Sequence, residues 1–220
     1  MSKLNIAVDG PAGAGKSTVA KNISKALGII YLDTGAMYRA VALKAIRKGL
    51  DTRDPQSLAS LVKDIDIRIE YRGNEQRIFL DGSDVSEQIR TPEVSIGASN
   101  VAAVPSVRIK LVELQRAIAN IHDVVMDGRD IGTYVLPNAK YKFFITASLE
   151  ERAKRRYQEL LAKGTAGLSF EEVMKDISYR DKNDSARAFA PLSKALDALE
   201  VDTTDMNPQE VANKILTYMK

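Results

Sequence analysis

The stretch Leu4–Ser17, which reads LNIAVDGPAGAGKS, determines how the rest of the chain can fold. Its end fills every fixed position of the phosphate-binding pattern G-x-x-x-x-G-K-[S/T], and an apolar run leads into it. The glycines let backbone N–H groups curl around a phosphate chain, while the lysine reaches the β- and γ-phosphates and the serine ligates Mg²⁺. Apolar residues at helical spacing follow, so a helix dipole points at the same place. The stretch therefore predicts a nucleoside triphosphate site.

The composition is typical of one large α/β domain with an insertion. The chain has 220 residues, 45% of them hydrophobic, and a formal net charge of +3, far from the basic runs of nucleic-acid-binding proteins. The absence of cysteine excludes disulfides and thiolate catalysis, and we interpret the single histidine, His122, as structural. No apolar run approaches the roughly 18 residues of a membrane span, and nothing before Leu4 reads as a signal peptide, so we expect a cytoplasmic protein.

Apolar strands alternate with amphipathic helices along most of the chain. We predict strands at 4–8, 29–32, 123–126, 141–145 and 199–201, and helices at 34–48, 54–62 and 105–120 and from 91 and 207. Two Ser-x-x-Glu capping boxes, at Ser148 and Ser169, open two further charged helices. This alternation, led by the phosphate-binding loop, predicts a doubly wound parallel sheet.

Residues 65–86 interrupt the alternation, because their hydrophobicity changes to a period of two. Every second residue from Ile65 to Tyr71 is apolar, a turn follows at Gly73, and a second strand is predicted at 77–80. The pattern predicts a small antiparallel sheet with one wet face, inserted into the main fold.

Charged residues cluster after two of the strands, where ligands gather in sheets of this class. In Asp33–Arg39, the Thr34 hydroxyl and the Arg39 guanidinium suit a phosphate dianion, although an N-cap beside a solvated arginine stays open as the alternative. In Asp127–Asp130, the first aspartate ends a buried strand and could hold Mg²⁺ through water. The alternative there is a glycine turn with a local ion pair.

Two more clusters lie on predicted helices. Arg180, Asp184 and Arg187 have the spacing of one helix face, which fits either a ligand site or an ordinary salt-bridge ladder. Upstream, Arg152, Arg155 and Arg156 could clamp a transferring phosphoryl group or form a solvated basic face.

The chain resembles the bacterial cytidylate kinases, which are nucleoside monophosphate kinases. Its matching segments occur in the family's order over nearly the whole chain: Gly10–Ser17, Asp33–Arg39, Ala98–Ala102 with Arg108, Asp127–Asp130 and Arg180–Leu192. The resemblance implies transfer of the γ-phosphoryl group of ATP to CMP or dCMP, with Mg²⁺. It also implies a single domain made of a core (1–33, 104–150, 190–220), a monophosphate-binding region with the inserted sheet (34–103) and a helical lid (151–189).

The resemblance also implies a role for each site residue. ATP would be bound by Gly10, Pro11, Ala12, Gly13, Ala14, Gly15, Lys16, Ser17 and Thr18, and Mg²⁺ by Ser17 and, partly through water, Asp127. CMP would be bound at its phosphate by Thr34, Arg39 and Arg129, at its cytosine by Ser99, Arg108 and Asp130, and at its ribose and neighbouring groups by Arg180, Asp184 and Arg187. Catalysis would depend on Lys16, Arg129, Arg152 and Arg156. Thr34 stands where some family members carry serine, which keeps the hydroxyl.

Three other functions fit the phosphate-binding loop less well. A GTPase switch would need D-x-x-G and [NT]-K-x-D, and the nearest approach, Asp181–Asp184, has aspartate in place of Asn or Thr. A kinase of another metabolite, such as shikimate or gluconate, would share the ATP site but not the cytosine residues. An inactive homologue would not need every phosphate-handling position intact. We expect small-molecule partners only, no nucleic acid or membrane, a monomer, and a loop at Gly164–Gly167 that closes over the substrates.

Overall fold

A five-stranded parallel sheet forms the centre of the computed structural model, which describes residues 3–73, 75–164, 167 and 169–219. Its strands lie in the order β2 (Ile30–Asp33), β6 (Val124–Asp127), β1 (Asn5–Asp9), β7 (Tyr141–Thr146) and β8 (Leu199–Asp202). Because all neighbours pair in parallel, their carboxyl ends meet at one edge of the sheet. The predicted doubly wound sheet is confirmed.

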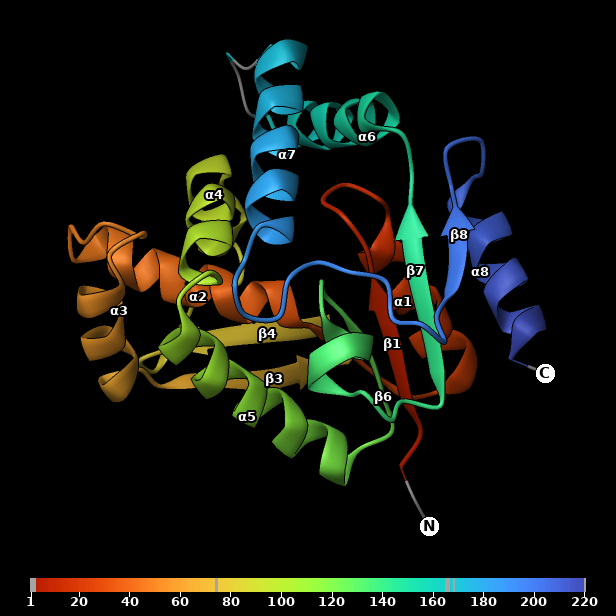
Figure 1. Ribbon diagram of the computed structural model, residues 1–220, viewed down its shortest axis with the longest axis horizontal. Coiled ribbons are helices and arrows are strands. Elements are labelled where there is room, and N and C mark those ends of the chain that lie inside the picture. Colours follow the sequence, from red (N-terminus) through yellow and green to blue (C-terminus); the bar gives the residue numbers. More distant parts are fainter. Residues whose placement is uncertain (1–2, 74, 165–166, 168, 220) are drawn as a thin grey trace.

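Helices cover both faces of this sheet because its central strands are apolar on both sides. On β1, Ile6 and Val8 face α1 (Lys16–Leu27) and α8 (Pro208–Tyr218), whereas Ala7 belongs to the cluster on the opposite face with α5 (Pro105–Ile121). In Figure 1, α8 lies at the outer side of β8, next to the C-terminal end.

The inserted segment forms a second, three-stranded sheet in the order β3 (Ile67–Arg72), β4 (Glu75–Leu80) and β5 (Ser83–Asp84). Its pairing is antiparallel, as predicted, although the two-residue β5 was not predicted. This sheet shares a hydrophobic cluster with α2 (Thr34–Arg47), α3 (Pro55–Leu61) and α4 (Pro92–Val101). Figure 1 shows this body beside the large sheet, with α2 lying along β3 and β4.

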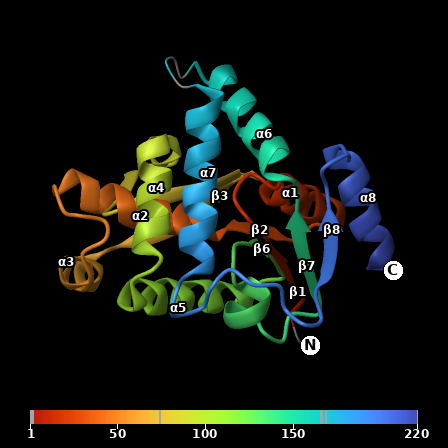
Figure 2. The same cartoon turned by 45° about the horizontal axis from the view of Figure 1, so that its top comes forward.

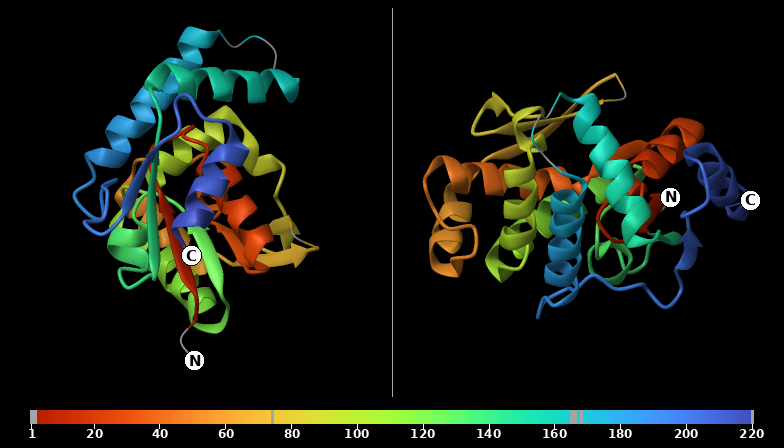
Figure 3. Two further views of the ribbon diagram at one scale, coloured as in Figure 1. Left: turned by 90° about the vertical axis from the view of Figure 1, so that its right-hand side faces the viewer. Right: turned by 90° about the horizontal axis from the view of Figure 1, so that it is seen from above.

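Two helices, α6 (Leu149–Ala162) and α7 (Phe170–Ser185), project from the body of the molecule. Figure 2 shows both helices rising over the large sheet, and Figure 3, seen from above, shows α7 next to α4. The loop predicted at Gly164–Gly167 includes residues 165 and 166, which lie outside the described residues.

Some local predictions were wrong in detail. Ser169 forms a complete capping box with Glu172, but at Ser148 the box is half formed, because Glu151 pairs with Arg155 instead of returning to the backbone. Arg187 lies beyond the end of α7, so it does not share a helix face with Arg180 and Asp184. Short helical turns at Val62–Asp64, Gln88–Arg90 and Ile131–Val135, the last a π-helical turn, were also not predicted.

The division into core, monophosphate-binding region and lid stays a prediction. Separate hydrophobic clusters give it a physical basis: one includes the inserted sheet, two line the faces of the large sheet, and one joins α6 to α7. Within the part of the chain that the structure describes, no helix combines the length and apolarity that crossing a membrane requires.

Gly10 is the position where the loop after β1 tolerates no side chain. Its φ is 144°, and a Cβ there would stand 1.9 Å from the carbonyl oxygen of Ile145 on β7. Gly10→Ala should therefore destabilise the protein by at least about 3 kcal/mol, measured by urea unfolding, because backbone must move. Gly28→Ala is the matched control: its φ is 67° but nothing lies within 4 Å, so it should cost only about 1–2 kcal/mol. Equal losses in the two variants would contradict this interpretation.

Candidate active site

The phosphate-binding loop connects β1 to α1, and Lys16 starts the helix behind a left-handed Gly15 (φ 88°). The Lys16 side chain is buried, and its Nζ donates to the carbonyl oxygen of Pro11 at 2.6 Å. Burial, together with the positive charge of Arg129, lowers the pKa of Lys16 to about 7. Because its partner is a neutral carbonyl group, the buried ammonium of Lys16 is strongly stabilised when an anion binds next to it. Binding a phosphate is the function predicted for Lys16.

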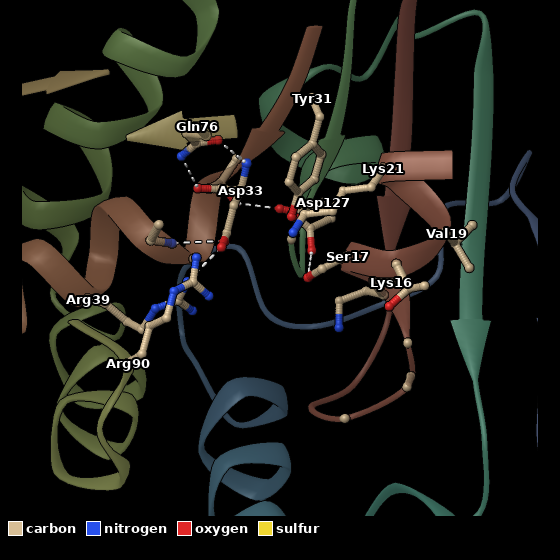
Figure 4. Close-up of a pocket in the computed structure, with 18 of the residues that line it drawn as sticks. Lys16, Ser17, Val19, Lys21, Tyr31, Asp33, Arg39, Gln76, Arg90 and Asp127 are labelled. Carbon is tan, nitrogen blue, oxygen red and sulfur yellow. Dashed lines mark hydrogen bonds and ion pairs between the residues drawn. The ribbon is translucent and has the colours of Figure 1, made fainter. Parts of the chain in front are cut away.

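Ser17 and Asp127 meet where the carboxyl end of β6 faces the start of α1 (Figure 4). The Ser17 hydroxyl donates to Asp127 Oδ2 at 2.6 Å, and Tyr31 donates to Oδ1 at 3.1 Å. Burial and the neighbouring charge of Asp33 raise the pKa of Asp127 to about 6. Two adjacent oxygen donors, one of them a carboxylate in need of positive charge, fit a magnesium ion.

The beginning of α2 is a second candidate anion-binding corner of the cleft. Asp33 caps the helix by accepting from the Ala36 N–H at 2.9 Å, and it also accepts from Arg39 Nη2 at 2.6 Å. The Thr34 hydroxyl donates to the main-chain oxygen of Asp127 at 2.7 Å, which links α2 to β6. A helix N-terminus with an arginine one turn away is a suitable phosphate site.

A buried ion pair lies deeper in the cleft. Arg108 of α5 is fully buried and its guanidinium pairs with Asp130, which follows β6. Arg108 also donates to the carbonyl oxygen of Ala102 at 3.1 Å and lies over the Tyr38 ring. Because an isolated buried charge is costly, each partner fixes the position of the other.

Asp184 of α7 is the centre of a second buried cluster. It accepts from Ser99 Oγ at 2.6 Å and from Arg129 Nε at 2.7 Å, and it pairs with Arg187. Burial would raise the pKa of Asp184, but the guanidiniums of Arg129 and Arg187 outweigh it and lower the pKa to about 2. Of the salt-bridge ladder considered as the alternative, the structure shows the pair of Asp184 and Arg187. Because the cluster also includes Ser99 of α4 and Arg129 after β6, it joins three chain segments rather than one helix face.

The remaining arginines divide into two groups. Arg155, Arg156 and Arg180 line the cleft, and burial next to Arg129 lowers the pKa of Arg180 to about 10. Arg152, by contrast, pairs with Asp181 and donates to the carbonyl oxygens of Ala12 at 2.9 Å and Ala147 at 3.0 Å. The catalytic role expected of Arg152 stays a prediction.

Two aspartates that hold the loops of the site were not selected from the sequence. Asp9 ends β1 and accepts from the N–H groups of Ile131 at 2.8 Å and Gly132 at 2.7 Å, and burial raises its pKa to about 7. Its place at the end of an apolar strand, like that of Asp127, was a usable signal. Asp181 accepts from the Ala12 N–H at 3.0 Å, a contact across 169 residues that no local pattern indicates.

One continuous cleft connects these parts. It has a volume of about 1540 Å³, larger than the roughly 300–1,000 Å³ of a usual small-molecule pocket, and so has room for two substrates. Its walls include the loop residues Gly13–Thr18 at one end and Ser99, Arg108 and Asp130 at the other. The same cleft is lined by Thr34, Arg39, Asp127, Arg129, Asp184 and Arg187, whereas Gly10, Pro11 and Ala12 lead into the phosphate-binding loop.

Asp184 should make stability depend on acidity. Its pKa is lowered in the folded state, so its contribution is fully present above the unfolded value of about 4 and is lost as the pH falls toward about 2. Asp184→Asn should be less stable than the wild type at pH 6, and the difference should shrink by about 2 kcal/mol by pH 2. Urea unfolding across this range measures it. A difference that is independent of pH would show that Asp184 is not ionised as the geometry indicates.

Comparison with known proteins places the chain in a family. A family profile described as "Cytidylate kinase" matches residues 6–220. Proteins named cytidylate kinase from Halalkalibacterium halodurans and Pelotomaculum thermopropionicum are 50% and 54% identical to it, covering 100% and 96% of this chain and 99% and 94% of theirs. An uncharacterized protein from Eubacterium ventriosum has a similar fold, with a TM-score of 0.54 at 14% identity and coverage of 99% and 98%. The chain belongs to the cytidylate kinase family.

Proposed function

We propose that this protein transfers the γ-phosphoryl group of ATP to CMP and dCMP, giving ADP and CDP or dCDP. The observation that carries the proposal is the single cleft that runs from the phosphate-binding loop to the buried pair of Arg108 and Asp130. The N-termini of α1 and α2 both line this cleft, together with cationic side chains such as Arg39, Arg129 and Arg180. Such a cleft suits two phosphorylated substrates that meet at their phosphates.

Catalysis in this cleft depends on alignment and charge. Lys16 binds the β- and γ-phosphates of ATP, while Arg39 and Arg129 hold the phosphate of CMP in line with the γ-phosphorus. Arg156 and Arg180 add positive charge to the cleft wall, where the equatorial oxygens of the transferring group need it. No general base is required, because the attacking phosphate oxygen is already anionic.

Ser17 and Asp127 would hold Mg²⁺, Asp127 partly through water. When bound, the ion neutralises charge on the β- and γ-phosphates. Within residues 3–219, leaving aside 74, 165, 166 and 168, no group of three or more acidic or histidine side chains forms a metal cage. An ion held by two protein oxygens, water and substrate phosphates is the usual arrangement for Mg²⁺ in kinases.

The cytosine end of the cleft explains the choice of base. Cytosine presents an amine donor and two acceptors, which match the carboxylate of Asp130 and the donors of Arg108. Ser99 would supply the remaining donor by turning its hydroxyl away from Asp184, to which it donates in this structure. Uracil presents an oxygen where cytosine has the amine, so it would leave a buried carboxylate facing an acceptor.

The proposal is tested by ADP release from Mg·ATP with CMP, dCMP, UMP, AMP, GMP and shikimate as acceptors. Strong turnover with CMP and dCMP, weak turnover with UMP and none with the others is the expected result. Turnover dominated by another acceptor would overturn the base assignment and leave the ATP site intact. ADP release without any acceptor would indicate an ATPase.

Asp130 should control the choice between CMP and UMP. Asp130→Asn keeps the side-chain volume but replaces an acceptor by a donor, so the ratio of kcat/KM for CMP to that for UMP should fall at least about tenfold. The ratio is measured within one variant, so a smaller folded fraction cancels. Asp66→Asn, which changes an exposed aspartate of the insertion, is the control and should leave the ratio unchanged. An unchanged ratio in Asp130→Asn would contradict the assignment.

A further inference from the structure

The strand that leads to the CMP phosphate site is an edge strand. β2 pairs with β6 on one side and has no strand partner on the other side within the residues that the structure describes. Backbone groups on a free edge need hydrogen-bond partners, and a free edge is less firmly held than a central strand. Because β2 runs directly into Asp33 and α2, anything that holds its edge also holds the corner with Thr34 and Arg39.

Two side chains of the inserted sheet supply these partners. The Gln76 carboxamide bonds Asp33 twice: its oxygen accepts from the Asp33 N–H at 2.8 Å and its amino group donates to the Asp33 carbonyl oxygen at 3.3 Å. The Tyr71 hydroxyl donates to the carbonyl oxygen of Tyr31, two residues earlier on the same edge, at 3.1 Å. A carboxamide carries the donor and the acceptor of a peptide group, so Gln76 takes the place of a residue in a missing neighbouring strand.

The two side chains act as a pair because of the register of the inserted sheet. Tyr71 on β3 and Gln76 on β4 are directly opposite each other, so they project from the same face toward β2. Figure 4 shows Gln76 against Asp33, with the Arg39 side chain on the other side of Asp33. Asp33 therefore connects two parts of the site. Its main chain is bonded to the inserted sheet, and its carboxylate is bonded to Arg39.

We propose that Tyr71 and Gln76 are positioning residues that dock the inserted sheet onto the edge of β2 and so hold Asp33 and Arg39 in place for the phosphate of CMP. This rests on the proposed function, in which Arg39 binds that phosphate. Both residues also line the cleft, but in this role they act on the CMP phosphate through Asp33 and Arg39. Arg90, in the helical turn that follows the inserted sheet, lies beside Arg39 at the cleft (Figure 4).

The test compares Gln76→Ala, Gln76→Met, Tyr71→Phe and the double variant Gln76→Ala/Tyr71→Phe with the wild type. Gln76→Met keeps the length of the side chain without either hydrogen bond, which covers the case in which the alanine variant does not fold. Loss of two hydrogen bonds should raise KM for CMP about 5- to 30-fold, with KM for ATP within about twofold of the wild type. Tyr71→Phe should raise KM for CMP by a smaller factor. In the double variant, KM for CMP should rise by less than the product of the two single factors, because both residues support the same docking of the inserted sheet.

Glu70→Gln is the matched control. Glu70 is the exposed neighbour of Tyr71 on β3, and alternation along the strand points its side chain to the opposite face. It should leave both KM values unchanged. Hydrogen exchange at the Asp33 amide, followed by NMR, gives a readout without turnover: it should be faster in the Gln76 variants and unchanged in Glu70→Gln.

A folded Gln76 variant with an unchanged KM for CMP would overturn the proposal. An equal rise of both KM values would also overturn it, because it would mean general loosening of the fold. Arg39→Ala separates this outcome from failure of the site assignment. If Arg39→Ala raises KM for CMP and the Gln76 variants do not, docking is refuted and the CMP site stands; if Arg39→Ala has no effect either, the proposed phosphate site is wrong.

Discussion

Three neighbouring strands each place a carboxylate at the same edge of the sheet, and many contacts of the site compensate the charge of these carboxylates. β1, β2 and β6 are parallel neighbours, each ends in aspartate, and the register pairs Asp33 with Asp127. Buried like charges repel, so each carboxylate needs a partner of its own. Asp9 accepts from two backbone N–H groups, Asp33 from the start of α2 and from Arg39, and Asp127 from two hydroxyls.

The other wall of the cleft carries the opposite charge. Burial, together with the charge of Arg129, lowers the pKa of both Lys16 and Arg180. For Arg129 itself, burial is outweighed by the carboxylate of Asp184, which raises the pKa. Asp184 compensates part of the positive charge, mainly that of Arg129 and Arg187. What remains is a cationic wall facing a carboxylate edge, and this arrangement is complementary to phosphates with a divalent cation. The two substrates thus complete the charge pairing of the cleft, and the electrostatic contribution to catalysis is already arranged before they bind.

The parts of the fold that could be predicted are those with a local signal. The period of hydrophobicity located the strands, and the polar residues at their ends marked Asp33–Arg39 and Asp127–Asp130 as candidate site segments. The half-formed capping box at Ser148 could not be predicted, because the competing partner of Glu151 depends on how α6 packs. The contacts of Asp181 and Gln76 could not be predicted either, because their partners lie 169 and 43 residues away. Both partners are backbone N–H groups, which almost every residue type carries, so the partner's identity gives no signal.

The different support of the two strands that lead to the substrate sites explains why the inserted sheet docks onto β2. The phosphate-binding loop follows β1, a central strand that pairs with β6 and β7, whereas the corner proposed for the CMP phosphate follows β2, which pairs with β6 alone among the described residues. An in-line transfer needs both phosphates fixed to a fraction of an ångström, so the less supported strand requires additional contacts. A further strand would supply them, but it would also cover the approach to the cleft from that side. A cross-strand pair of side chains supports β2 at Tyr31 and Asp33 and leaves the cleft accessible to CMP.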